Sequence, residues 1–432
     1  MSVEESDPRY QAVLAHLAAR GRFGIRLGLG RTRALLARLG DPHVGLPGVL
    51  IGGTNGKGST QALVASVLRE GGILVGQTPK PHLVSYRERI VVDGRPIAVE
   101  DFTNLLAEVL EQADFVARKH GPPTEFEVLT AAAFLWFKRS GVEVGVIEVG
   151  LGGRLDATNA WQGGVSAITN VALDHMEHLG NTIEAIAREK AAIMKRGDSY
   201  AVTGASEPAL RVIRARSRRV GVQLDVREPL EVVGMDLDGV RVREHDLRIG
   251  LLGGHQAANA SVALGILGAL ERANIAYAPP AQLERGFANA RWPGRLEFIR
   301  VEGHPQVLLD GAHNPHGVAA LAQALIALQR HLGDATPTLL MGVLANHWQD
   351  GMLDPLKSAV PGARFVATNV PGAPNSMPPA DLAAAWGSGA TPIDDTDKAF
   401  DTAAAKASGT LVVCGSLYLV GYLRAKLVGA DL

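Results

Sequence analysis

Short apolar runs alternate along this chain with stretches in which apolar residues recur every three to four positions. Residues 48–51, 142–149 and 165–171 are apolar runs of strand length, whereas 126–139 and 183–195 have helical spacing. Strands that alternate with helices in this way predict a mostly parallel sheet with helices packed on its faces.

A second series of strand-length runs follows the segment Trp292-Pro293-Gly294-Arg295, whose adjacent Pro and Gly are typical of a joint between domains. Before the joint, residues 222–252 alternate as β-strands do and 255–273 have helical spacing. We therefore predict an α/β protein with an N-terminal P-loop-type, mostly parallel sheet domain over residues 1–293. A smaller, Rossmann-like α/β domain is expected over residues 294–432. The runs beyond the joint are 307–310, 339–343, 364–368 and 410–414.

Composition narrows the class of protein. A chain of 432 residues with 47% hydrophobic and 20% charged residues can bury two cores, so a globular, two-domain protein is expected. The formal charge of −1 and the lack of a long basic run argue against a nucleic-acid surface. Residues 251–270 form the longest apolar stretch, but they contain His255, Gln256 and Asn259, which argues against a membrane span.

Cysteine content and the N-terminus both point to the cytoplasm. Cys414 is the single cysteine, so no intramolecular disulfide can form. Residues 1–10 are acidic and polar, unlike a secretory signal sequence.

The segment Gly53-Thr-Asn-Gly-Lys-Gly-Ser59 follows the apolar run 48–51 and precedes a helical pattern. Glycines in this setting let backbone N–H groups turn toward a phosphate, and Lys57 adds a positive charge. The hydroxyl of Ser59 or Thr60 can reach a phosphate-bound Mg²⁺. The segment therefore predicts use of a nucleoside triphosphate, although Gly58 separates it from the ordinary Walker spacing.

Polar side chains follow two of the predicted strands. Glu148 shares one strand face with apolar residues and stands where the strand ends, so it predicts either a Mg²⁺ ligand or an ion pair with Arg154. The next strand is followed by His175 and His178, either of which can be a metal ligand or an ordinary histidine.

Lys190 falls on the apolar stripe of the predicted helix 183–195. Burial lowers the pKa of a lysine, and the neutral amine can react with CO₂ to form a carbamate, which is a metal-binding anion. The alternative is a lysine that extends to solvent beside Glu189.

In the second predicted domain, Asp310 ends a strand and His313 lies in the polar turn that follows. Arg295 lies at the domain joint, where its guanidinium could reach ATP phosphates when the two domains close.

Taken together, these motifs resemble the folylpolyglutamate synthase and dihydrofolate synthase family of the Mur ligase superfamily. The resemblance covers nearly the whole chain. Its motifs are Leu27-Gly-Leu-Gly-Arg31, Gly53 to Ser59, Pro81-His-Leu-Val-Ser-Tyr-Arg-Glu-Arg-Ile90, Glu148-Val-Gly-Leu-Gly-Gly-Arg-Leu-Asp-Ala-Thr-Asn159, Leu173-Asp-His175, Arg188-Glu-Lys-Ala191, Pro293-Gly-Arg295, Asp310 to Pro315 and Cys414-Gly-Ser416.

The resemblance implies an ATP- and Mg²⁺-dependent ligase that joins L-glutamate to dihydropteroate, to a folate or to both, through an acyl phosphate. It implies a monomer that binds small molecules. Ser59 would ligate a first Mg²⁺, Glu148 and His175 would hold a second, and Lys190 would be carbamylated. The ATP-binding residues would be Thr54, Asn55, Gly56, Lys57, Gly58, Ser59, Thr60, Asn259, Arg295 and Asp310, assisted by His313; the pterin-acid pocket would be formed by Thr124, Glu125, Phe126, Glu127, Arg154, Leu155, Asp156 and Ala157.

Two segments depart from the family pattern. Lys80 stands where the family usually has a serine that binds the second Mg²⁺, and an ammonium cannot coordinate a metal. Asn346-His347-Trp348 stands where an Asp-Lys-Asp run is common. These departures leave open a Mur-type ligase with another acid or amine. A P-loop ATPase without ligase activity is a further alternative, but it gives Lys190, His175 and the 310–314 turn no role.

Overall fold

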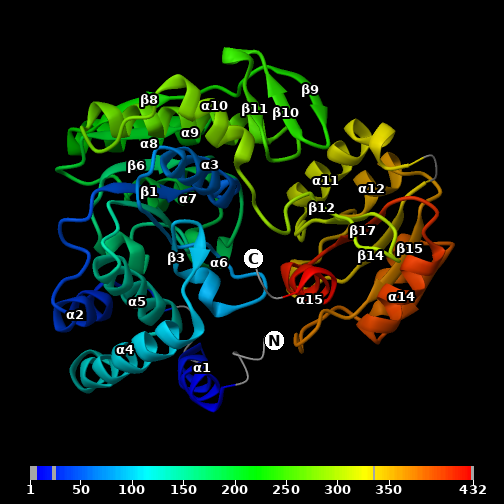
Figure 1. Ribbon diagram of the computed structural model, residues 1–432, viewed down its shortest axis with the longest axis horizontal. Coiled ribbons are helices and arrows are strands. Elements are labelled where there is room, and N and C mark those ends of the chain that lie inside the picture. Colours follow the sequence, from blue (N-terminus) through cyan, green and yellow to red (C-terminus); the bar gives the residue numbers. More distant parts are fainter. Residues whose placement is uncertain (1–6, 22–25, 334–335, 430–432) are drawn as a thin grey trace. The chain divides into compact units, whose positions relative to one another are not determined.

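The computed structural model describes residues 7–21, 26–333 and 336–429, which divide into two compact units (Figure 1). The first unit comprises the described residues of Met1–His82, Tyr86–Leu230 and Ala257–Ala290. The second comprises those of Leu83–Ser85, Glu231–Gln256 and Arg291–Leu432.

The sequence predicts one division, at residue 293, and the last change of unit lies close to it, between Ala290 and Arg291. It does not predict that residues 231–256 group with the second unit. Period-two alternation shows which side chains share a face, but it does not show which neighbours cover that face.

An eight-stranded sheet organises the first unit, in the order β4-β3-β2-β5-β1-β6-β7-β8. Six adjacent strands, β2, β5, β1, β6, β7 and β8, run parallel to one another. β3 and β4 extend the sheet beyond β2 in antiparallel pairs. The carboxyl ends of β2, β5 and β1 therefore lie side by side. The strands are β1 (Gly48–Gly52), β2 (Val75–Gln77), β3 (Val91–Val92), β4 (Arg95–Pro96), β5 (Val144–Glu148), β6 (Gly164–Ile168), β7 (Tyr200–Thr203) and β8 (Gln223–Val226).

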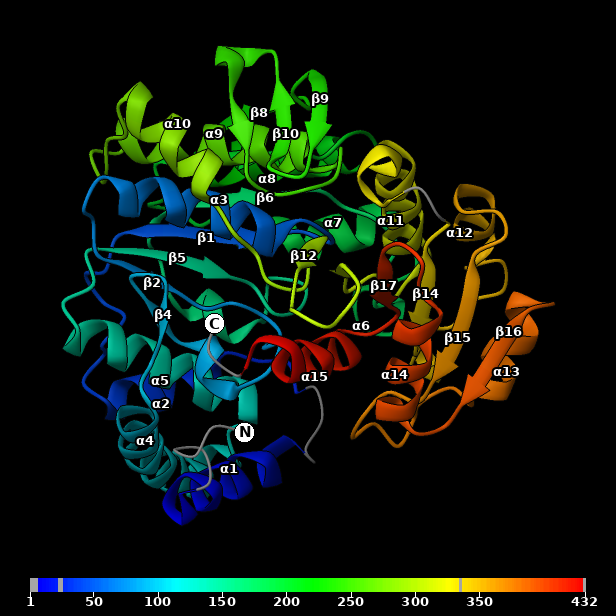
Figure 2. The ribbon, with the colours of Figure 1, turned by 45° about the vertical axis from the view of Figure 1, so that its right-hand side comes forward.

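Helices cover both faces of this sheet. One face shares a core with α1, α2, α4, α5, α7 and α8, whereas α3 lies on the other face beneath α10 (Figure 2). Gln282 of α10 donates to the backbone oxygen of Val67 in α3 at 2.7 Å, which joins these two helices. The helices are α1 (Pro8–Gly21), α2 (Gly30–Arg38), α3 (Lys57–Glu70), α4 (Val99–His120), α5 (Glu125–Arg139), α6 (Met176–Leu179), α7 (Ile183–Ala191), α8 (Ala209–Val220), α9 (Gln256–Arg272) and α10 (Pro280–Asn289).

The second unit contains a three-stranded antiparallel sheet, β11-β10-β9, and a six-stranded sheet, β12-β13-β17-β14-β15-β16. In the larger sheet only β12 is antiparallel to its neighbour. The strands are β9 (Val232–Asp236), β10 (Gly239–Val242), β11 (Arg248–Ile249), β12 (Glu297–Ile299), β13 (Val307–Leu309), β14 (Thr338–Met341), β15 (Arg364–Thr368), β16 (Ala390–Ile393) and β17 (Leu411–Cys414).

Alternate residues of the larger sheet enter two separate cores. Val412 and Cys414 of β17 pack with α11, α12 and α13, whereas Leu411 and Val413 pack with α14 and α15. This three-layer arrangement is the α/β fold that the sequence predicts for the C-terminal part. The helices are α11 (Pro315–Ala327), α12 (Asp354–Ala359), α13 (Pro379–Trp386), α14 (Thr396–Lys406) and α15 (Leu417–Val428).

The predicted elements are largely confirmed, with differences at their ends. The helix predicted over 183–195 ends at Ala191, after which Asp198 accepts a bond from the backbone N–H of Lys195 and shapes a turn. Among the described residues, no helix has the length and apolar character needed to cross a membrane.

Candidate active site

The loop between β1 and α3 has a backbone that requires glycine at two positions. Gly53 has a φ of +143° and Gly56 a φ of +80°. A Cβ atom on Gly56 would lie 2.0 Å from Asn259 Oδ1, and one on Gly53 would lie 1.9 Å from Thr169 Oγ1. The loop thus packs closely against its neighbours and leads directly into the N-terminus of α3, which is the arrangement of an anion site.

Residues that follow β6 hold this loop in place. Asn170 accepts from the backbone N–H of Thr54 at 3.1 Å through its backbone oxygen and from that of Asn55 at 2.9 Å through Oδ1. Thr169 Oγ1 donates to the backbone oxygen of Asn55 at 2.6 Å. Sequence reasoning does not assign this supporting role to Asn170; the available signal is its position at the end of the strand next to β1.

Two lysines meet at one backbone oxygen of the loop. Lys57 Nζ donates to the oxygen of Gly53 at 3.2 Å and to that of Thr54 at 3.0 Å, and Lys190 Nζ donates to Gly53 at 2.8 Å. Burial, and then the nearby Lys57, lower the pKa of Lys190 to about 7, against a smaller opposing effect of Asp174. Lys190 is only 4% exposed, so of the two alternatives the structure supports the buried amine.

Glu148 ends β5 beside the strand that leads into the loop, with Ile51 of β1 as its partner in register. It is buried, and its Oε1 lies 4.0 Å from Lys57 Nζ. Arg154, the alternative ion-pair partner, instead donates to Glu189 Oε1 at 3.0 Å. The carboxylate of Glu148 is thus associated with the phosphate loop.

Oxygen ligands suited to Mg²⁺ lie on both sides of this loop: the hydroxyl-bearing Ser59 in the first turn of α3, and Glu148. Mg²⁺ prefers oxygen and keeps several water and phosphate ligands, so these two residues fit the ion when a nucleotide is bound. His175 precedes α6 and is about half exposed, 3.8 Å from Asp174 and 3.9 Å from Glu177. The described residues include no group of three or more His, Cys, Asp or Glu side chains arranged as a metal cage, so water and phosphate would complete the coordination.

Lys80 brings another positive charge to the end of β5. Its Nζ donates to the backbone oxygen of Glu148 and lies 4.4 Å from the centroid of the Phe126 ring. Burial lowers the pKa of Lys80 to about 8, and Asp156 and Glu148 act in the opposite direction.

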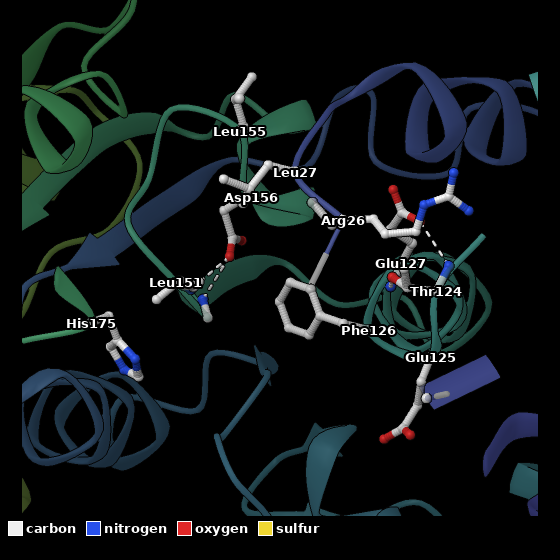
Figure 3. A pocket seen from close by; sticks show the side chains of 13 residues that line it. Arg26, Leu27, Thr124, Glu125, Phe126, Glu127, Leu151, Leu155, Asp156 and His175 are labelled. Atoms are coloured by element: carbon white, nitrogen blue, oxygen red, sulfur yellow. Dashed lines mark hydrogen bonds between the residues drawn. The ribbon is translucent and has the colours of Figure 1, made fainter. Parts of the chain in front are cut away.

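A pocket of about 290 Å³ opens in the first unit next to the end of β5 (Figure 3). Leu27, Phe126, Leu151 and Leu155 provide apolar walls, which suit a flat, largely apolar ligand. Arg154, expected in this pocket, pairs with Glu189 instead. Seven of the eight predicted pocket residues line it: Thr124, Glu125, Phe126, Glu127, Leu155, Asp156 and Ala157; sequence reasoning did not place Gly21, Arg26, Leu27, Gly150, Leu151 and His175 there.

Two carboxylates that line the pocket accept hydrogen bonds from other groups of the protein. Glu127 forms a capping box with Thr124 at the start of α5 and accepts from Arg31 Nε at 3.0 Å. Asp156 Oδ2 accepts from the backbone N–H groups of Gly150 at 3.0 Å and Leu151 at 2.8 Å, as the dashed lines of Figure 3 show. These carboxylates therefore stabilise the shape of the pocket.

In the second unit, the predicted residues gather in the turns around β13. Asp310 Oδ2 accepts from the backbone N–H of Leu296 and Oδ1 from that of Ala312, both at 2.9 Å. Burial raises the pKa of Asp310, and the nearby Arg295 opposes this shift. The His313 ring lies 2.7 Å through Nδ1 from the backbone oxygen of Gly311, and 5.1 Å between centroids from the ring of His347.

Comparison with known proteins shows the family to which this chain belongs. Residues 51–267 match the Mur ligase middle domain, and residues 294–417 match the Mur ligase glutamate ligase domain. The dihydrofolate synthase/folylpolyglutamate synthase of Bacillus subtilis is 35% identical over 97% of this chain and 99% of its own length. The chain belongs to the dihydrofolate synthase/folylpolyglutamate synthase family of Mur ligases. It is therefore an ATP-dependent carbon–nitrogen ligase of that family.

Solved members of the dihydrofolate synthase/folylpolyglutamate synthase family have the same fold as this chain. The Mycobacterium tuberculosis folylpolyglutamate synthase complexed with ADP superposes with a TM-score of 0.84 at 32% identity, over 98% of this chain and 99% of that one. E. coli FolC in complex with DHPP and ADP gives a TM-score of 0.81 at 30% identity, over 96% and 97% of the two chains.

Proposed function

We propose that this protein joins L-glutamate to dihydropteroate, to a folate (poly)glutamate, or to both. The observation that carries the proposal is the pairing of β1 with β5: one strand leads into the phosphate loop, and the other leads into the 150–157 wall of the apolar pocket. These strands are parallel neighbours, so their carboxyl ends lie side by side. A nucleotide bound after β1 and an acid bound after β5 would therefore meet next to Glu148.

The reaction has two steps. A carboxylate oxygen of the acid forms a bond to the γ-phosphorus of ATP while the bond from that phosphorus to the β–γ bridging oxygen breaks, which releases ADP. The amine nitrogen of L-glutamate then forms a bond to the acyl carbon, and phosphate leaves as the amine loses its proton. Mg²⁺, when bound, would neutralise phosphate charge and align the reacting groups.

Residues of the loop would serve the first step by position and charge. Backbone N–H groups of residues 54–60 and the ammonium of Lys57 would bind the phosphates, and Asn259 would support the loop at Gly56. Ser59, Glu148 and His175 would hold Mg²⁺. Arg295 and Asp310, with His313, belong to the second unit and would also bind ATP.

Lys190 would act as a carbamate. Its neutral amine attacks the carbon of CO₂ and loses a proton, so that a buried cation becomes an anion able to bind a metal. The low pKa of Lys190 supports this role, because it provides neutral amine near pH 7.

The test is ATP-dependent phosphate release by the purified protein with Mg²⁺ and L-glutamate, in the presence of 7,8-dihydropteroate, tetrahydrofolate or no acid. Release that requires an acid, with a glutamate mass added to that acid, is the expected result and identifies the step. ATP binding without turnover on either acid would assign the ligase to another substrate. Gel filtration and cell fractionation would test the further proposal that it acts as a monomer in the cytoplasm.

A further inference from the structure

Three adjacent strands of the first unit place a phosphate loop, a carboxylate and an ammonium group at the carboxyl end of the sheet. β1 leads into the phosphate loop, β5 ends at Glu148, and β2 is followed after two residues by Lys80. Because β5 lies between the other two strands, Lys80 and the phosphate loop flank the same strand end.

Two contacts fix the ammonium of Lys80 in this position. One N–H group donates to the backbone oxygen of Glu148, and the charge lies over the face of Phe126, a pocket residue. An ammonium carries three N–H groups, so the bond to Glu148 leaves capacity to bind an anionic oxygen of a ligand. The ammonium of Lys80 therefore lies between Phe126 of the pocket and the end of β5, and β5 itself ends beside the phosphate loop.

The acids around Lys80 do not remove this capacity. Asp156 already accepts bonds from Gly150, Leu151 and Thr158, and the carboxylate of Glu148 faces Lys57 at 4.0 Å. A second divalent ion, placed between the end of β5 and Lys80, would meet the ammonium groups of Lys80 and Lys57, and like charges repel strongly at partly buried sites.

We propose that Lys80 is a catalytic residue whose ammonium contacts the reacting carboxylate as it accepts the phosphoryl group, in place of a second divalent ion. The inference rests on the proposed ligase function. The bonds that form and break are those of the first step above, and Lys80 supplies charge without transferring a proton. A fixed cation next to the carboxylate reduces the repulsion between this anion and the γ-phosphate and holds the attacking oxygen toward the phosphorus, which accelerates the step.

Counting metal ions tests this on the unmodified protein. Mn²⁺ bound to the complex with AMPPCP and 7,8-dihydropteroate is measured by electron paramagnetic resonance. One tightly bound Mn²⁺ per chain is expected, and two would overturn the proposal.

Single-turnover ADP formation provides the second readout. Lys80→Met is expected to slow this step about 100-fold or more while the Kd for AMPPCP changes less than about threefold. The control is Lys195→Met, which removes another lysine whose pKa burial lowers to about 8 and whose Nζ donates to the backbone oxygen of Trp161. This control should retain full turnover.

ADP formation by Lys80→Met at the wild-type rate would overturn the role of Lys80 and leave the ligase function intact. The opposite failure is also distinguishable: if the wild-type protein forms no ADP with any acid, the ligase function itself is wrong.

Discussion

Lys57 and Lys190, which are far apart in sequence, donate hydrogen bonds to the same backbone oxygen, that of Gly53. The two amines therefore lie close together, and the charge of Lys57 contributes to the low pKa of Lys190. The loop and helix α7 thus form one electrostatic unit, in which a change at either lysine alters the other.

Loss of Lys190 should abolish ligation while leaving the fold intact. We expect Lys190→Ala to lower kcat at least about 100-fold, because it removes the group that would become the metal-binding anion. Added acetate or formate should restore part of the rate. Thermal unfolding measured by circular dichroism provides the control for folding; turnover equal to that of the wild type would remove Lys190 from the mechanism.

Carbon dioxide should influence the same residue. Protein freed of CO₂ at pH 6 is expected to regain activity when bicarbonate is added at pH 8, because the neutral amine predominates above its pKa of about 7. Recovery is measured as initial rate against bicarbonate concentration. Lys190→Ala provides the control, since bicarbonate should have no effect on it.

Lys190 should also make stability depend on pH. Between pH 7 and 10.5 the unfolded lysine holds a proton that the folded one has lost, so raising the pH favours the folded state. Below pH 7 both forms are protonated, and the cost of burying the charge is present in full. The stability of the wild type relative to Lys190→Met should therefore rise across this window, by at most about 1.4 kcal/mol per pH unit. Urea unfolding in CO₂-free buffers at pH 6 to 10 measures it; parallel curves would contradict the prediction.

Gly56→Ala should weaken ATP binding. The new Cβ would lie 2.0 Å from Asn259 Oδ1, so the loop must shift away from its present position. We expect at least a tenfold rise in the Kd for ATP, about 1.4 kcal/mol, measured by calorimetry. Gly72→Ala is the matched control: Gly72 has a similar φ of +78° but nothing within 4 Å of its Cβ position. Equal losses in both variants would mean that backbone strain, and not the contact with Asn259, explains the effect.

Leu27→Ala should weaken binding of the acid. Leu27 is 41% exposed yet lines the pocket, so its loss affects the ligand more than the fold. Removing part of a leucine contact predicts a rise in the KM for the acid of about tenfold, with the KM for ATP unchanged. Val44→Ala is the control, because Val44 is 71% exposed and belongs to the loop before β1.

The sequence predicts where a site residue lies within its own helix or strand better than it predicts the hydrogen bonds between distant segments. Apolar periodicity is enough to place Lys190 on a buried stripe and Glu148 at a strand end, because each follows from spacing within one element. The bonds from Asn170 to the phosphate loop and from Arg31 to Glu127 join segments more than ninety positions apart, and spacing carries no information about them.

The sequence also fails to predict the hydrogen-bond partners of Asp310 and Arg154. Asp310 follows a strand, as predicted, but its carboxylate binds the backbone N–H groups of Leu296 and Ala312, which only the folded turns bring together. Arg154 belongs to a recognised motif, yet its pairing with Glu189 of α7 could not be inferred from that motif.

The chain returns to the first unit after β11, so no single cut in the sequence separates the two units. Val240, Val242 and Ile249 of the β9–β11 sheet are fully buried, although α9 and α10, which belong to the other unit, follow them in sequence. A fragment that ends at residue 293 would retain this sheet but lose residues 294–432, with which the sheet forms one compact unit. The second unit is drawn from three segments of the chain, so a single crossover near residue 293 between the genes of two homologues would combine the β9–β11 sheet of one parent with the six-stranded sheet of the other.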